Sequence, residues 1–114
     1  MTPTQRTLKL LKEQGYTVRV VERWNPFARK RLDLFGGDIL AIKRGLPPLL
    51  VQCTSAANLA SRWTKSIRSQ EVKSWLLTLH ASFEVWGWSK RGKRGERKLW
   101  DVTVRPVYLC NLEV

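Results

Sequence analysis

Apolar residues recur along the chain with two different periods, and these periods predict the order of its elements. Leu8 and Leu11 lie one helical turn apart, and Gly15 supplies a stop after them. They follow Thr2-Pro3, a pair typical of an N-cap with proline at the first helical position. We therefore expect a first helix over residues 3–14.

Three apolar runs then predict strands. The first, YTVRVVER at residues 16–23, is rich in β-branched residues and precedes a turn-prone Asn25-Pro26. The second and third, residues 38–43 and 49–51, are nearly continuous in apolar residues and are joined by a short loop. Runs without alternation are typical of strands that are covered on both faces.

The helical period returns at residue 56 and slips once near Ser69, which predicts one broken helix or two consecutive helices. Alternation resumes over residues 83–85 and 100–104 and predicts two further strands. The order predicts an α/β sandwich with a mixed sheet, as one domain over residues 1–114. The apolar positions of the helical segment are Ala56, Leu59, Ala60, Trp63, Ile67, Val72, Trp75, Leu76 and Leu79.

Charge is the outlier of the composition. The chain carries 21 Lys and Arg against 9 Asp and Glu, a net charge of +12. Nucleic acids and anionic membranes are the commonest partners of so basic a surface. The N-terminal segment does not resemble a signal peptide, and no apolar run approaches a membrane span. We expect a cytoplasmic protein with no membrane partner. The expected partner is nucleic acid, with DNA favoured over RNA.

The spacing of Cys53 and Cys110 indicates neither a zinc site nor a disulfide scaffold.

Basic residues gather in two loops. The segment WSKRGKRGERK, residues 88–98, holds six basic residues against one acid and predicts a hairpin tip that follows phosphates. A charge run is also typical of a solvated loop, but a second basic cluster after the first strand favours nucleic acid. Phosphate contacts carry no base information, so we expect recognition of shape or ends. The candidate DNA-binding residues of these loops are Arg29, Lys30, Arg31, Lys90, Arg91, Lys93, Arg94, Arg97 and Lys98.

Polar residues stand at the ends of the two apolar runs. Asp38 begins the second predicted strand, and Gln52 and Thr54 end the third on one face, because strand side chains alternate. Asp38 and Gln52 could therefore share an ion. Asp33 precedes Asp38 by five residues, and Gly36-Gly37 permits a turn that aims both carboxylates at one ion. A surface ion pair of Asp33 with Arg29 or Arg31 is an equal alternative.

This order of elements, with an Asp on the second strand and a three-residue polar motif on the third, resembles the PD-(D/E)XK nuclease superfamily. The small basic Holliday-junction-resolvase-like members are the most similar. The resemblance covers about residues 4–105 and implies a restriction-endonuclease-like αβββαβ core, with a central mixed sheet flanked by helices. It implies that Asp38, Gln52 and the backbone carbonyl of Cys53 hold Mg²⁺ or Mn²⁺. A glutamate of the first helix often completes such sites, and Glu13 is the candidate.

The motif departs from the family pattern. Gln52-Cys53-Thr54 stands where the family has Glu-x-Lys, so the site loses one carboxylate and its lysine. A lysine on another element could supply the missing cation, and Lys65 is the first candidate, with Lys43 second. Lys65 belongs to a polar stripe that could face a phosphodiester backbone, although such a stripe is also typical of a solvated helix face. The stripe consists of Asn58, Arg62, Lys65 and Ser69.

The resemblance implies a Mg²⁺-dependent endonuclease that hydrolyses DNA phosphodiester bonds, with branched DNA among the substrates. One alternative is a catalytically inactive nucleic-acid-binding module of the same fold, and another is a structural or RNA-binding protein. Stand-alone versions of the fold occur in phages and other mobile elements, which suggests such a source.

Trp86 and Trp88 share one strand face. We expect this face to pack against the helices; the second alternative is that it forms a homodimer interface, and the third is that it stacks on bases.

Overall fold

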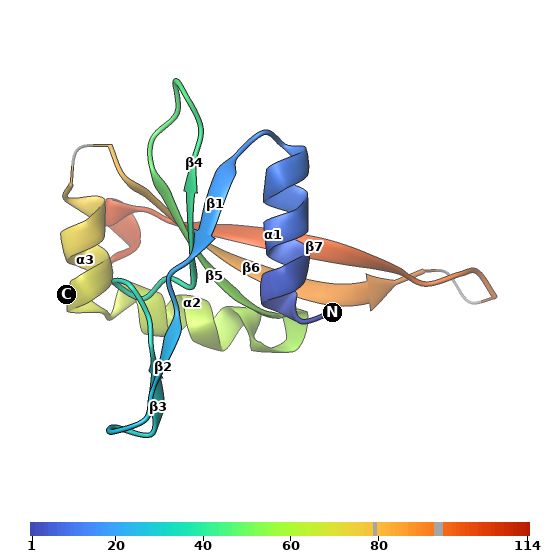
Figure 1. Ribbon diagram of the computed structural model, residues 1–114, viewed down its shortest axis with the longest axis horizontal. Helices are drawn as coiled ribbons and strands as arrows, with labels where there is room; N and C mark the ends of the chain where they lie inside the picture. The colour runs from blue at the N-terminus through green and yellow to red at the C-terminus, as the bar shows by residue number, and fades with distance from the viewer. Residues whose placement is uncertain (79, 93–94) are drawn as a thin grey trace.

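A five-stranded mixed sheet forms the centre of the molecule (Figure 1). The computed structural model describes residues 1–78, 80–92 and 95–114, so the predicted Leu79, Lys93 and Arg94 lie outside the described residues. The strand order is β1-β4-β5-β6-β7, and β5 and β6 pair parallel while the other neighbours are antiparallel. The strands are β1 (Thr17–Val20), β4 (Ile39–Ile42), β5 (Leu49–Ser55), β6 (Ser82–Arg91) and β7 (Leu99–Val107).

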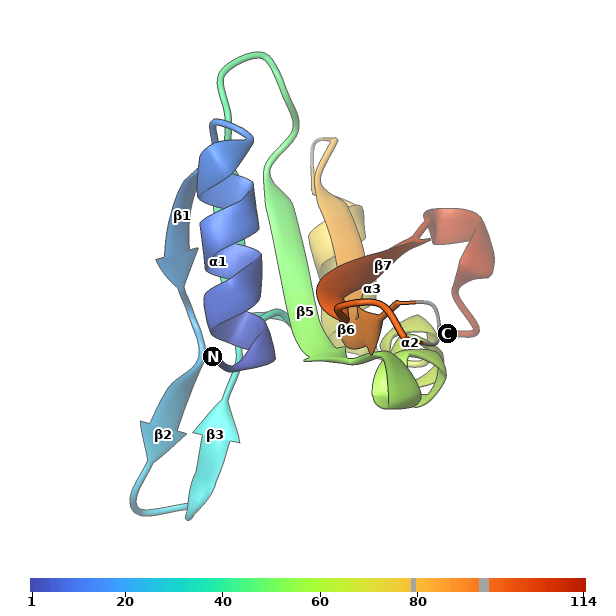
Figure 2. The same cartoon turned by 90° about the vertical axis from the view of Figure 1, so that its right-hand side faces the viewer.

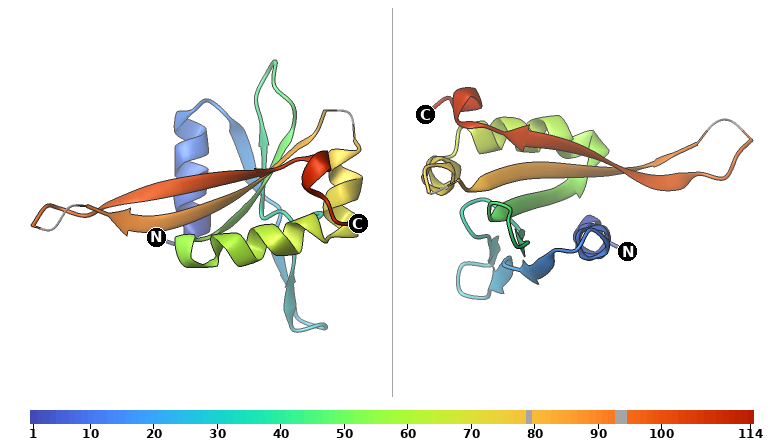
Figure 3. Two further views of the ribbon diagram at one scale, coloured as in Figure 1. Left: turned by 180° about the vertical axis from the view of Figure 1, so that it is seen from behind. Right: turned by 90° about the horizontal axis from the view of Figure 1, so that it is seen from above.

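Helices cover both faces of this sheet, which confirms the predicted α/β class (Figures 2 and 3). Helix α1 (Pro3–Glu13) packs on one face, and its N-cap is Thr2, as the Thr-Pro pair predicted. Helices α2 (Leu59–Ile67) and α3 (Gln70–Leu76) pack on the other. They are two consecutive helices, because Ser69 caps α3 by accepting a hydrogen bond from the Val72 backbone N–H. Short 3-10 turns, η1 (Ala56–Asn58) and η2 (Leu109–Asn111), complete the elements.

The core has two layers, one on each side of the sheet. The first contains Trp86 and Trp88 beneath α1, and the Trp88 indole Nε1 donates to the Thr7 hydroxyl at 2.8 Å. The second contains Phe83 and Val85 beneath α2 and α3. Burial of the two tryptophans against the helices is confirmed, so they do not form a dimer face; a homodimer through another surface stays a prediction.

A second, two-stranded ribbon was not predicted. The structure corrects the strand over residues 16–23, which ends at Val20, and the chain continues into a separate ribbon that projects from the sheet (Figures 1 and 2). The Asn25-Pro26 turn forms the tip of this ribbon, where the Asn25 side chain accepts hydrogen bonds from the backbone N–H groups of Phe27 and Ala28. The ribbon consists of β2 (Arg23–Asn25) and β3 (Lys30–Leu32).

The last two strands form the predicted basic hairpin. Strands β6 and β7 pair from Phe83 opposite Val107 to Arg91 opposite Leu99, and their distal half extends beyond the helices (Figure 1). In the described ranges of the chain, no helix has the length and apolar character that crossing a membrane requires.

Candidate functional site

A polar depression of about 400 Å³ lies beside the end of β5. Its walls come from the N-terminal turn of α1, from Asp38 just before β4, from β5, from α2 and from the base of the ribbon. All of its lining residues except Thr4 and Glu22 are ones that the sequence indicated. They are Thr4, Glu22, Arg31, Asp33, Asp38, Gln52, Cys53, Arg62 and Lys65.

Asp38 is held at the centre of this depression by both neighbouring segments. Its Oδ2 accepts a hydrogen bond from the Cys53 backbone N–H at 2.9 Å. Its backbone N–H donates to the Val51 carbonyl, and its carbonyl accepts from the Val21 N–H, both at 2.9 Å. Asp38 is therefore fixed at the start of β4, between β5 and the segment that follows β1.

A tight turn places Asp33 next to Asp38. Phe35 and Gly36 both have positive φ, 49° and 88°, as a type I′ turn requires, and Leu34 and Gly37 bond to each other across it. The Asp33 carboxylate accepts a hydrogen bond from the Gly36 backbone N–H at 3.1 Å. The predicted turn at the glycine pair is thus present, and it sets the two aspartates side by side.

The surroundings of Asp38 disfavour its charge. Burial, and to a smaller extent the negative charges of Glu22 and Asp33, raise the pKa of Asp38 from 3.8 to about 6. The Cys53 N–H and the Arg62 guanidinium act in the opposite direction and lower this pKa. A carboxylate that is crowded by two other carboxylates is electrostatically prepared for a cation.

Glu22 is the charged residue of the depression that sequence reasoning missed. It follows β1 directly, and the pairing of Val20 with Ile39 carries it to the start of β4, beside Asp38. Its carboxylate accepts from Arg31 Nη1 at 3.2 Å, with 18% of the Glu22 side chain exposed. Among the ion pairs of the described residues, Arg31 therefore pairs with Glu22 and not with Asp33. The acid at the end of YTVRVVER was the available signal.

The three residues of the polar motif have different surroundings. Gln52 is 9% exposed, faces α2 and accepts a hydrogen bond from the Ser66 hydroxyl at 3.4 Å. Thr54 points to the same face, as alternation predicted, but it is buried opposite Gly87 and is not among the residues that line the depression. Burial raises the pKa of the Cys53 thiol to about 12, so it remains protonated. Cys53 contacts Asp38 through its backbone.

The structure brings only part of the predicted helix residues to the depression. Arg62 and Lys65 line it from α2, whereas Asn58 stands at the exposed start of that helix. Lys43 lies elsewhere, since its ammonium donates to the Gln14 carbonyl at 2.7 Å.

The structure does not bring Glu13 to the site. Thr4 lines the depression, and Glu13 lies nine residues further along α1, which corresponds to about 13 Å. Glu13 lines a different depression, together with Arg6, Lys9 and Trp100. Periodicity indicated which face of the helix packs on the sheet, but not which end of the helix lies at the site.

The predicted metal ligands do not form a closed coordination shell. Within residues 1–78, 80–92 and 95–114, no three His, Cys, Asp or Glu side chains are arranged to hold a metal ion. A cation at Asp38 would therefore need ligands of other kinds, such as the Gln52 carbonyl or water.

The predicted DNA-binding loops are exposed, and some of their basic side chains form hydrogen bonds or ion pairs within the chain. Arg29 and Lys30 lie on the ribbon. On the hairpin, the Arg91 guanidinium bonds to the Thr103 hydroxyl at 2.8 Å and to Asp101 at 3.5 Å. Lys90, Arg97 and Lys98 are further exposed basic residues near the hairpin tip.

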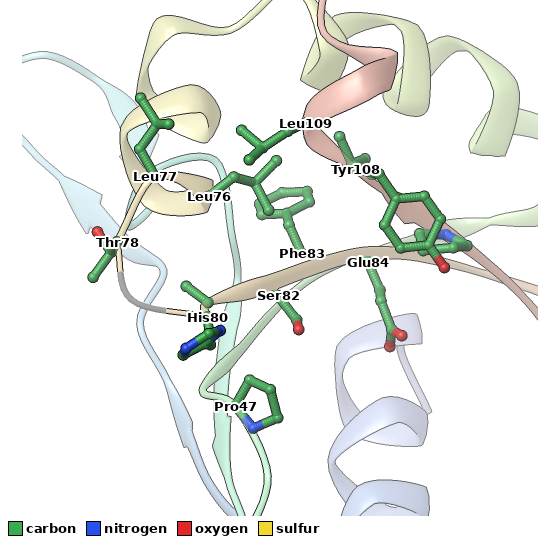
Figure 4. A pocket seen from close by; sticks show the side chains of 13 residues that line it. Pro47, Leu76, Leu77, Thr78, His80, Ser82, Phe83, Glu84, Tyr108 and Leu109 are labelled. Atoms are coloured by element: carbon green, nitrogen blue, oxygen red, sulfur yellow. The ribbon is translucent and has the colours of Figure 1, made fainter.

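A larger depression of about 650 Å³ lies on another part of the surface (Figure 4). Its walls are mainly apolar, with Leu76, Phe83, Tyr108 and Leu109 around it. It contains none of the predicted site residues, so the smaller polar depression is the better candidate for chemistry.

Comparisons of the chain with protein-family models, curated proteins and solved structures found no match.

Proposed function

We propose that the chain is a divalent-metal-dependent endonuclease that hydrolyses DNA phosphodiester bonds at the polar depression. One observation carries this proposal: Asp38, with Glu22 and Asp33 beside it, shares a depression with Arg62 and Lys65 in a chain of net charge +12. Phosphodiester hydrolysis needs carboxylates for a metal ion and cations for the phosphate at one place. The mixed sheet, with three antiparallel strands followed by helices and a parallel strand, is compatible with a restriction-endonuclease-like core.

The donor atoms of the depression fit a hard cation. Carboxylate and amide oxygens are the ligands that Mg²⁺ prefers, and Mg²⁺ commonly keeps several waters and takes one or two carboxylates. Asp38 is the first ligand that we assign, with Gln52, Asp33 and Glu22 within the same depression. When bound, Mg²⁺ or Mn²⁺ would lower the pKa of a bound water and neutralise charge on the phosphate.

The chain's own residues would orient the substrate. Arg62 and Lys65 offer two cations from one face of α2 to the phosphate, and Lys65 supplies the ammonium that Thr54 lacks. The Cys53 N–H holds the Asp38 carboxylate in one orientation, so that ligand needs little reorganisation. The basic ribbon and hairpin would hold the flanking phosphates.

A cleavage assay tests this proposal. Branched, duplex and single-stranded DNA are incubated with Mg²⁺ or Mn²⁺ and the native chain, Asp38→Asn, Lys65→Ala or Arg44→Ala. Arg44 is an exposed cation of the turn between β4 and β5 and serves as the charge-matched control. We expect cleavage to be lost in Asp38→Asn, to fall at least about tenfold in Lys65→Ala, and to persist in Arg44→Ala. Undiminished cleavage by Asp38→Asn would refute the assignment.

A DNA-binding module without catalysis is the second candidate function. The specific observation in its favour is that Gln52 is neutral and already bonded to Ser66, while Thr54 is buried. This candidate predicts DNA binding that is independent of metal, with no cleavage of any of the three substrates.

A further inference from the structure

The ribbon of β2 and β3 presents two exposed aromatic rings. Phe27, at its tip, is 98% exposed, and Trp24, in β2, is 59% exposed. Both rings line one hollow, and contiguous exposed apolar surface is typical of a contact site. Figures 1 and 2 show that the ribbon extends away from the central sheet, so the rings are accessible to a large ligand.

The tip of the ribbon is held in one shape. The Asn25 Oδ1 accepts hydrogen bonds from the N–H groups of Phe27 at 3.0 Å and Ala28 at 3.3 Å. A hollow of about 300 Å³ lies along the ribbon, with both aromatic rings in its wall and Arg23 beside them. A preformed hollow between aromatic rings and a guanidinium is suited to a planar ring that stacks.

The charge of the ribbon identifies the partner as an anion. Residues 23–32 contain four basic residues, Arg23, Arg29, Lys30 and Arg31, and no acid. Alternating aromatic rings and cations are the combination that binds single-stranded nucleic acid, because the rings stack on bases and the cations follow the phosphates. In a paired duplex, the bases are stacked on one another and are not available to these rings.

The ribbon also connects this aromatic surface to the candidate active site. Trp24 pairs with Arg31 across the ribbon, so the two side chains lie on the same face. Arg31 bonds to Glu22 and lines the polar depression that contains Asp38. A strand that stacks on Trp24 would therefore pass directly to that depression.

We propose that the β2–β3 ribbon binds unpaired bases of DNA through Trp24 and Phe27 and leads that strand into the depression. The preferred substrate then has a single-stranded segment next to the cleaved bond. This last statement rests on the proposed nuclease function, whereas base stacking by the ribbon is testable without any cleavage.

Fluorescence anisotropy in EDTA tests the ribbon with a labelled oligothymidylate strand and a duplex of the same length. The variants are Trp24→Ala with Phe27→Ala, the conservative Trp24→Phe, and Leu77→Ala as an exposed apolar control outside the ribbon. We expect the double variant to lose about tenfold or more in affinity for the single strand and less than about threefold for the duplex. Trp24→Phe should retain most of the affinity, and Leu77→Ala should match the native chain.

Equal losses on both DNAs, or no loss on the single strand, would overturn the inference. So would an unchanged affinity for the single strand together with loss of binding to phosphatidylglycerol vesicles, which would make the ribbon a membrane contact. Both rings are exposed, so an unchanged thermal unfolding midpoint serves as the check on folding. Ring-dependent binding without cleavage would refute only the nuclease, and cleavage without ring dependence would refute only the ribbon's role.

Discussion

Replacing Asp38 by asparagine should stabilise the folded chain at alkaline pH, although it removes the central carboxylate of the candidate site. The cause is the environment of this side chain: burial, and then the charges of Glu22 and Asp33, raise its pKa to about 6. Asparagine retains a side-chain oxygen that can accept the hydrogen bond of the Cys53 N–H. The substitution therefore removes the unfavourable charge and keeps the contact.

The magnitude follows from the pKa of Asp38 in the folded and unfolded states. The folded chain holds a proton up to about pH 6, whereas the unfolded chain releases it near 3.8. The free energy of unfolding therefore falls as the pH rises between these values, and the full penalty is present above them. At about 1.4 kcal/mol per pKa unit the penalty is about 3 kcal/mol. Asp38 retains some contact with water, so we expect about 2 kcal/mol.

Urea unfolding in EDTA measures this effect. Asp38→Asn should exceed the native free energy of unfolding by about 2 kcal/mol near pH 8, and most of this difference should be gone near pH 4. Asp101→Asn, at an exposed carboxylate of β7, is the control and should change stability by less than about 0.5 kcal/mol. A variant that is less stable than the native chain near pH 8, or equally stabilised at both pH values, would refute the reasoning.

Three further predictions concern the core, the turn and the hairpin. Thr7→Val should destabilise the chain by about 1–3 kcal/mol in urea unfolding, because the buried Trp88 N–H loses its acceptor, whereas Thr7→Ser should not; equal stabilities would contradict this hydrogen bond. Gly36→Ala should lower the free energy of unfolding by at least about 1 kcal/mol more than Gly45→Ala. Both glycines have positive φ, but only a Cβ at position 36 would meet Val72, at 2.9 Å; equal losses would exclude the clash. Neutralising Lys90, Arg97 and Lys98 together, three of the described cations near the hairpin tip, should reduce the salt dependence of DNA affinity by up to about three in log–log slope. An unaltered slope would place the binding surface elsewhere.

The convergence of Asp38, Gln52 and Lys65 could be predicted because it depends on local order. An acid that begins one strand lies close to the end of an antiparallel neighbour, and the helix after that neighbour starts at the same edge. The apolar runs likewise indicated strands covered on both faces, because both faces do carry helices. These features require no knowledge of distant segments.

The ribbon and the acid beside it could not be predicted in the same way. Its strands, residues 23–25 and 30–32, are too short to show a period, so the chain there is indistinguishable from a basic loop. Glu22 reaches Asp38 only because β1 stops at Val20 and pairs with β4 in one register. The prediction that Glu13 lies at the site was wrong for a related reason. Tertiary packing, and not the local sequence, determines which end of α1 meets β5.

The depression lacks the net positive charge of the chain as a whole, because its three carboxylates balance its three cations, and this difference has a measurable consequence for DNA binding. The basic ribbon and hairpin attract phosphates, but a phosphate beside Asp38 also meets the charges of Glu22 and Asp33. Without a metal ion, these carboxylates repel the DNA that the basic residues attract. Asp38→Asn should therefore bind single-stranded DNA more tightly than the native chain in EDTA, by about threefold or more, at low salt. An affinity at or below the native value would mean that phosphates do not reach the depression, and it would remove the basis for placing hydrolysis there.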